Sequence, residues 1–143
     1  MSFKLHPQLL ADCYDLGALD DCSLLLHKNA LLPWFILVPH STENELYKLE
    51  SNLQNSVQKS INKLAQFVES HFITDKLNIA TIGNIVPQLH IHIIGRFKND
   101  FCWPLPVWGQ SEFTPYKDDK LDLIKQALLE QIIKPDHLDH LSR

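Results

Sequence analysis

The sequence predicts a single α+β domain built on an antiparallel sheet. Short apolar runs rich in branched and aromatic residues occur in two pairs, and a turn-like segment separates the members of each pair. A long stretch with apolar residues every three or four positions lies between the pairs, and a second such stretch follows them. Because strands joined by hairpins pair antiparallel, this order of strand pairs and helices predicts the α+β class.

Composition limits the classes of function. The 143 residues, 45% of them hydrophobic and 21% charged, suffice for one domain over residues 1–143 with a core of its own. The net charge of −4 gives no general attraction to nucleic acid polymers. No apolar run reaches the roughly 20 residues of a membrane span, and no signal segment is evident. We therefore expect a cytoplasmic protein that binds neither membranes nor nucleic acid polymers.

The cysteines predict neither a disulfide framework nor a metal knuckle. They are odd in number and widely spaced: Cys13, Cys22 and Cys102. We expect reduced thiols, as is usual for cytosolic proteins.

The first part of the chain predicts a short helix, a loop and a hairpin. The helix is expected over residues 7–14, and the loop over 15–21, where aspartates and a glycine gather. Residues 22–27 and 34–38 are expected to be the strands of the hairpin. Residues 24–26 taken alone fit a buried helix equally well.

Two amphipathic helices are predicted. The long one is expected to begin at a capping box formed by Thr42 and Glu45. The other is expected over residues 117–133 and to end before Pro135. The long helix presents one apolar stripe that predicts contact with the sheet: Leu46, Leu49, Leu53, Val57, Ile61, Leu64 and Val68.

A second hairpin is predicted over residues 77–82 and 87–94, with a turn or bulge between them. Successive side chains of a strand point to opposite faces, so residues 87–94 divide into two rows. The apolar row can be buried, and the polar row then lies on the open face with a spacing of about 7 Å. The polar row is Gln88, His90 and His92.

Three interpretations of this polar row remain open. It is a solvated strand face without chemistry, a metal site, or a site of nucleophilic catalysis on phosphate. A metal site needs a third ligand such as His27, and no companion metal motif is present. A neutral imidazole can instead attack phosphorus and form a covalent intermediate, with a second imidazole stabilising the phosphoryl charge.

Residues 83–94, Gly-Asn-Ile-Val-Pro-Gln-Leu-His-Ile-His-Ile-Ile, resemble the signature of the histidine triad (HIT) superfamily. That signature is His-φ-His-φ-His-φ-φ, with φ apolar and a glycine shortly before it. The similarity covers most of residues 22–108 and is greatest to bacterial HIT proteins of the diadenosine-polyphosphate hydrolase type. The resemblance implies a HIT-like fold of about five strands and a homodimer with one continuous sheet. It also implies cleavage of nucleoside phosphates at the α-phosphorus through a nucleotidyl-histidine, without metal or cofactor.

The resemblance implies that His90 is the nucleophile and that His92 binds the phosphate. Nδ1 of His90 is then expected to be held by a backbone carbonyl, which leaves Nε2 free to attack. Gln88 replaces the first histidine, and its amide can hydrogen-bond phosphate but cannot carry a proton near neutral pH. A nucleotide-binding module with little turnover and a metal-dependent hydrolase remain the alternatives. Further substrate contacts are implied at Asn78, Asn29, His27, Arg96 and Trp103.

Overall fold

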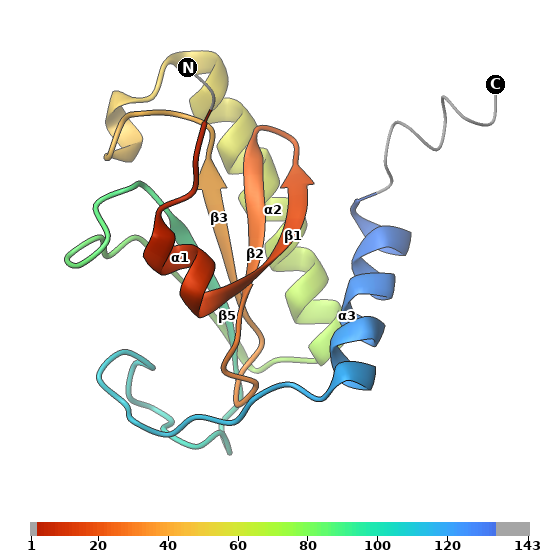
Figure 1. Ribbon diagram of the computed structural model, residues 1–143. Helices are drawn as coiled ribbons and strands as arrows, with labels where there is room; N and C mark the ends of the chain where they lie inside the picture. The colour runs from red at the N-terminus through yellow and green to blue at the C-terminus, as the bar shows by residue number, and fades with distance from the viewer. Residues whose placement is uncertain (1–2, 134–143) are drawn as a thin grey trace, which may run out of the picture.

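The computed structural model describes residues 3–133 and shows five strands in one antiparallel sheet, as predicted (Figure 1). The sheet has the order β1-β2-β3-β5-β4. A short 3₁₀ turn, η1 (Leu46–Lys48), precedes the long helix. The remaining elements along the chain are α1 (Pro7–Asp12), β1 (Cys13–Leu19), β2 (Cys22–His27), β3 (Trp34–Pro39), α2 (Ser51–Phe72), β4 (Lys76–Ala80), β5 (Ile91–Arg96) and α3 (Asp118–Gln131).

Strand β1 lies where the sequence predicted the end of a helix and a loop. It pairs with β2, and the register shifts between Asp15 and Ala18. Gly17 adopts a φ of 101° inside this bulge, and its amide donates to the Asp15 carboxylate. Because β1 is an edge strand, a bulge with loop-forming residues is tolerated there. The loop prediction was therefore wrong for residues 15–19, whereas residues 20–21 form the turn between β1 and β2.

Helix α2 begins later than predicted. Its N-cap is Glu50, whose side chain accepts a hydrogen bond from the Leu53 amide. The predicted cap at Thr42 lies in an irregular segment, where Ser41 accepts from the Glu43 amide instead. The C-terminal helix α3 closely matches its prediction, and Pro135 lies outside the described residues.

The central strands are buried on both faces, which the sequence did not predict. One face packs against α2 and α3, and the other packs against α1 and the loop that follows β5. In Figure 1, α2 runs behind the sheet and α1 crosses in front of it. All six residues of β3 and of β5 are consequently buried. The histidine face is therefore a partly covered cleft rather than an open surface.

The second hairpin is confirmed as a pairing, since β4 and β5 are antiparallel neighbours. Strand β5 begins at Ile91 and not at residue 87 as predicted, so Gln88 and His90 lie in an irregular segment just before the ladder. Within residues 3–133 no helix is long and apolar enough to cross a membrane. The three cysteines are buried and unpaired with one another.

Candidate active site

A cleft lies on the α1 face of the sheet at the start of β5. Its volume is about 470 Å³, within the range of sites for small molecules. Helix α1, strands β2, β3 and β5, the segment 82–86 and the loop after β5 all contribute to its walls. The polar and aromatic side chains of this lining include Asp12, His27, Trp34, His90, His92 and Trp108.

His90 is held as predicted. Its Nδ1 lies 2.7 Å from the backbone carbonyl oxygen of Gln88. A carbonyl oxygen only accepts hydrogen bonds, so Nδ1 must donate and carries the proton. In the neutral imidazole, Nε2 then keeps its lone pair, and no described residue hydrogen-bonds to it. His90 therefore presents a nucleophilic nitrogen on a side chain that is only 7% exposed.

His92 is held in the opposite way. The indole Nε1–H of Trp34 donates to Nδ1 of His92 over 3.0 Å. Burial, with the nearby His90 and His27, lowers the pKa of His92 to about 3. The neutral ring with an acceptor Nδ1 carries its proton on Nε2. His92 therefore offers a hydrogen-bond donor 4.9 Å, centroid to centroid, from the ring of His90.

His27 joins these two histidines from the end of β2, as predicted. Its ring stacks on Trp34 with centroids 4.0 Å apart and an interplanar angle of 8°. Its Nδ1 accepts from the Asn29 amide at 3.1 Å. Burial lowers the pKa of His27, although the charge of Asp12 opposes the shift. His27 is thus a neutral imidazole with its proton on Nε2.

Trp34 and Trp108 are site residues that the sequence did not identify. The Trp108 ring stands edge-on to His92, with centroids 5.0 Å apart, and edge-on to Trp34. The prediction chose Trp103, which lines no part of the cleft and lies instead against the Arg96 guanidinium. The only sequence signal for Trp108 was its position in the same aromatic loop.

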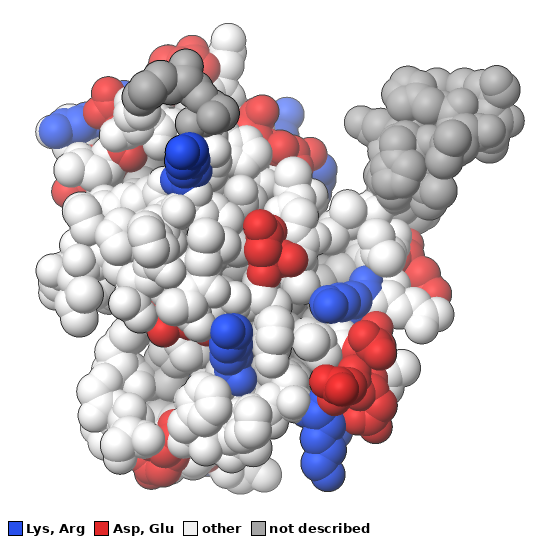
Figure 2. All heavy atoms as spheres, in the orientation of Figure 1, with Lys and Arg blue, Asp and Glu red and all other residues white. Residues whose placement is uncertain are grey.

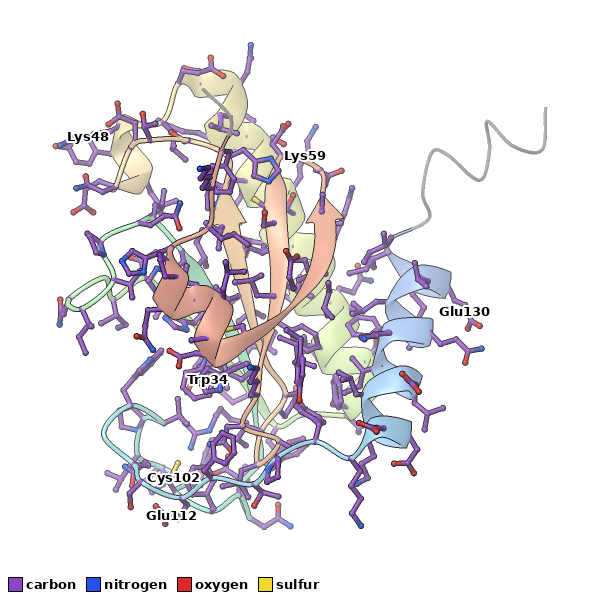
Figure 3. All side chains as sticks on the ribbon, in the orientation of Figure 1. Trp34, Lys48, Lys59, Cys102, Glu112 and Glu130 are labelled. Carbon is purple, nitrogen blue, oxygen red and sulfur yellow. The ribbon has the colours of Figure 1, made fainter. Side chains whose placement is uncertain are left out.

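Arg96 and Asn78 form a buried network instead of lining the cleft. The Arg96 side chain is 2% exposed and donates to Asp100 at 2.8 and 3.1 Å and to Asn78 at 2.8 Å. The hydrogen bond to Asp100 raises the pKa of Arg96 despite the opposing effect of burial. The network fixes the start of the loop that carries Trp108. Figure 3 shows Trp34 at the same end of the molecule as Cys102 in this loop.

The Asn29 side chain also makes its hydrogen bonds to other parts of the protein. Its side-chain amide donates to the Glu112 carbonyl and accepts from the Leu31 and Thr114 amides. These bonds join the β2–β3 connection to the segment before α3. Asn29 does not line the cleft.

The Gln88 side chain turns away from the cleft to the N-terminal segment. Its Oε1 accepts from the His6 amide at 2.8 Å, and its Nε2 donates to the Lys4 carbonyl at 2.9 Å. We call this pair of bonds the Gln88 clamp. The clamped segment leads directly into α1, which supplies Gln8, Leu9 and Asp12 to the cleft wall.

Comparison with known proteins identifies the family. The HIT domain profile matches residues 11–99, more than half of the chain. The chain belongs to the HIT family.

Solved structures of HIT proteins are similar over nearly their whole length. A histidine triad protein from Marinobacter aquaeolei is 36% identical, with a TM-score of 0.88 over 94% of this chain and 98% of its own. One from Bradyrhizobium japonicum is 34% identical, with a TM-score of 0.89 over 92% and 99%. A histidine triad (HIT) protein from Sinorhizobium meliloti is 32% identical, with a TM-score of 0.86 over 90% and 96%. No curated protein sequence matches the chain.

The HIT site of this chain combines imidazoles without a metal-binding arrangement. Within the described range, no three or more His, Cys, Asp or Glu side chains are grouped to hold a metal ion. The face shown in Figure 2 carries acidic and basic side chains in small separate groups rather than one extended basic surface. The arrangement is suited to nucleophilic attack by His90 on a small ligand with hydrogen-bond donation from a neighbouring ring.

Proposed function

We propose that this HIT protein hydrolyses or transfers nucleotidyl groups at the α-phosphate of a nucleoside phosphate. The substrate is of the dinucleoside-polyphosphate or nucleoside-phosphoramidate type. The observation that carries the proposal is the bond between Nδ1 of His90 and the Gln88 carbonyl, which leaves Nε2 as a lone-pair nucleophile in the cleft. The apolar and aromatic lining of the cleft suits a nucleobase.

The reaction proceeds in two displacements. The Nε2 lone pair of His90 forms a bond to the α-phosphorus, and the bond from phosphorus to the leaving group breaks with its electron pair. Water then attacks the same phosphorus and loses a proton to the solvent. The phosphorus–nitrogen bond breaks with its electron pair returning to Nε2 of His90, and a nucleoside monophosphate leaves. His92 donates its Nε2–H to the phosphoryl oxygen in both steps, where charge develops.

The protonation of the site favours a phosphate leaving group. His92 and His27 have lowered pKa values and are poor acids as neutral rings, and the Gln88 amide cannot supply a proton. A polyphosphate departs as an anion without protonation, whereas an amine needs a proton. We therefore propose that dinucleoside polyphosphates are better substrates than phosphoramidates.

Intact mass spectrometry tests this function. The wild type, His90→Ala and the exposed control His40→Ala are each mixed with diadenosine polyphosphate or adenosine phosphoramidate. We expect a transient nucleotidyl adduct in the wild type and in His40→Ala, with or without a chelator, and none in His90→Ala.

Two outcomes would contradict covalent catalysis. Binding with neither adduct nor product would identify a nucleotide-binding module, the alternative suggested by glutamine at position 88. Product formation that a chelator abolishes would identify a metal-dependent hydrolase.

We also propose a homodimer in which β4 of one copy pairs with β4 of the other. Within residues 3–133, strand β4 is an edge of the sheet and pairs only with β5. Its Ile79 side chain is half exposed. An uncovered edge strand with an apolar side chain is a natural site for strand pairing.

A further inference from the structure

Two imidazoles of one cleft carry their protons on opposite nitrogens. His90 donates from Nδ1 to a carbonyl, and His92 accepts at Nδ1 from an indole. A carbonyl cannot donate and an indole N–H cannot accept, so neither arrangement can be reversed without breaking the bond. The substrate-facing nitrogens therefore differ, one being an acceptor and the other a donor.

We propose that Trp34 is the positioning residue that fixes His92 as an Nε2–H donor. The catalytic meaning of this assignment rests on the function proposed above. An indole N–H serves this purpose better than a carboxylate or carbonyl oxygen. Either oxygen would accept a hydrogen bond from Nδ1 and so hold the proton on that nitrogen. Such a partner would turn the Nε2 lone pair of His92 toward the phosphate and repel it.

The position of Trp34 is itself fixed on both sides. The β3–β5 register places Trp34 opposite Ile94, one strand away from His92, and the indole is 8% exposed. The His27 ring stacks on one indole face, and Trp108 meets the indole edge-on with centroids 6.1 Å apart. These contacts hold the N–H direction toward His92.

The surroundings of His92 keep the donor state over a wide pH range. The titratable groups that face it are His90 in the segment before β5 and His27 at the end of β2, and a positive charge on either disfavours a charged His92. Asp12 of α1 acts on His27. Trp34 of β3 and Trp108 of the loop after β5 carry no charge. The neutral Nε2–H form of His92 therefore persists well below pH 6.5.

Nuclear magnetic resonance of histidine-labelled protein tests the assignment without substrate. Wild type, Trp34→Phe and Trp108→Phe are labelled with ¹⁵N, and His92→Gln identifies the His92 signals. We expect wild-type His92 to show an unprotonated Nδ1 and a protonated Nε2 from pH 8 to pH 5. In Trp34→Phe the two nitrogen signals should move toward each other as both tautomers become populated, and His92 should titrate closer to pH 6.5. Trp108→Phe, which loses a neighbouring indole but no hydrogen bond to His92, should keep the wild-type pattern.

A second measurement needs no variant. Scalar coupling across the hydrogen bond between Trp34 Nε1 and His92 Nδ1 should appear in the wild-type spectrum. A protonated Nδ1, a missing coupling, or the same change in both tryptophan variants would overturn the proposal. A wild type with the expected tautomer that forms no nucleotidyl adduct would instead overturn the proposed function and leave the role of Trp34 intact.

Discussion

The Gln88 side chain holds the N-terminal segment instead of facing the cleft. The side-chain amide of Gln88 has an acceptor oxygen and a donor nitrogen side by side. The oxygen accepts from a backbone N–H of the N-terminal segment, and the nitrogen donates to a backbone carbonyl of the same segment. An imidazole offers its two nitrogens in diverging directions and cannot match this geometry. The backbone carbonyl of the same residue still holds His90, and that bond does not depend on the side chain.

Replacing Gln88 by histidine should therefore weaken the site. In Gln88→His the two clamp bonds are lost, and at about 1 kcal/mol each the free energy of unfolding should fall by about 1–2 kcal/mol. The α1 wall of the cleft loosens, so KM should rise severalfold while the His90 adduct still forms. Urea denaturation and steady-state kinetics measure both effects.

Gln66→His on the exposed side of α2 is the matched control and should change neither quantity. Higher turnover in Gln88→His with unchanged stability would show that position 88 acts as a triad position after all.

The sequence indicated the histidines of the site but not their partners. Alternation along one strand places His90 and His92 on the same face, and a strand end supplies His27. Trp34 could not be found this way, because its contact with His92 depends on which strands are neighbours. The family resemblance implied substrate contacts at Arg96 and Asn78, but a sequence does not show that polar atoms are already paired internally.

At the scale of elements, the hydrophobic pattern predicted an element correctly where one face of it is buried and its apolar residues recur at a regular spacing. Helices α2 and α3 follow their apolar stripes, although a chemically reasonable cap at Thr42 was not the one used. Strand β1 was missed because an edge strand with a bulge at Gly17 needs neither strict alternation nor strong strand-forming residues. The pairing of β1 with β2 depends on tertiary contacts, which the composition of the segment does not reveal.

Strand β5 passes closely under the end of α2 only because residue 95 is glycine. A Cβ there would lie 2.6 Å from Cγ2 of Thr74 and 2.8 Å from Cγ of Pro33. Gly95→Ala should therefore reduce the free energy of unfolding by about 1–3 kcal/mol, as overpacked sites do. The measurement is the urea midpoint of the variant against the wild type.

The double variant with Thr74→Ser provides the control, since serine removes the nearest obstructing methyl group. It should recover part of the lost stability relative to Gly95→Ala alone. A Gly95→Ala protein as stable as the wild type would mean that β5 and its neighbours shift freely at this point.

At the scale of the molecule, burial of the sheet on both faces determines where the site can lie. Central strands read as continuous apolar runs. Their buried polar side chains either line the cleft, where the covering layer is incomplete, or are paired internally, as Arg96 is at the end of β5. The sequence predicted the α2 face correctly. It could not show that α1 and the loop after β5 close over the opposite face, because those contacts join distant parts of the chain.

The free edge of β4 leads to a test of assembly. If β4 strands of two copies pair, wild type should sediment as a dimer at micromolar concentration. Ile79→Lys, with a charge on the edge strand, should sediment as a monomer.

Leu123→Lys is the control, because Leu123 is an apolar residue on α3, away from this edge, and is more exposed than Ile79. A wild type that sediments as a monomer would contradict the continuous sheet.

The Gln88 clamp also makes the cleft wall observable by isotope exchange. The His6 amide proton is shielded from solvent by its bond to Gln88 and becomes available to deuterium only when that bond opens. The exchange rate of this proton therefore reports how often the N-terminal segment separates from the sheet. A bound nucleotide that contacts α1 would slow this exchange in proportion to its occupancy. The exchange of a single amide proton therefore reports both the local opening of the ligand-free protein and the occupancy of its site.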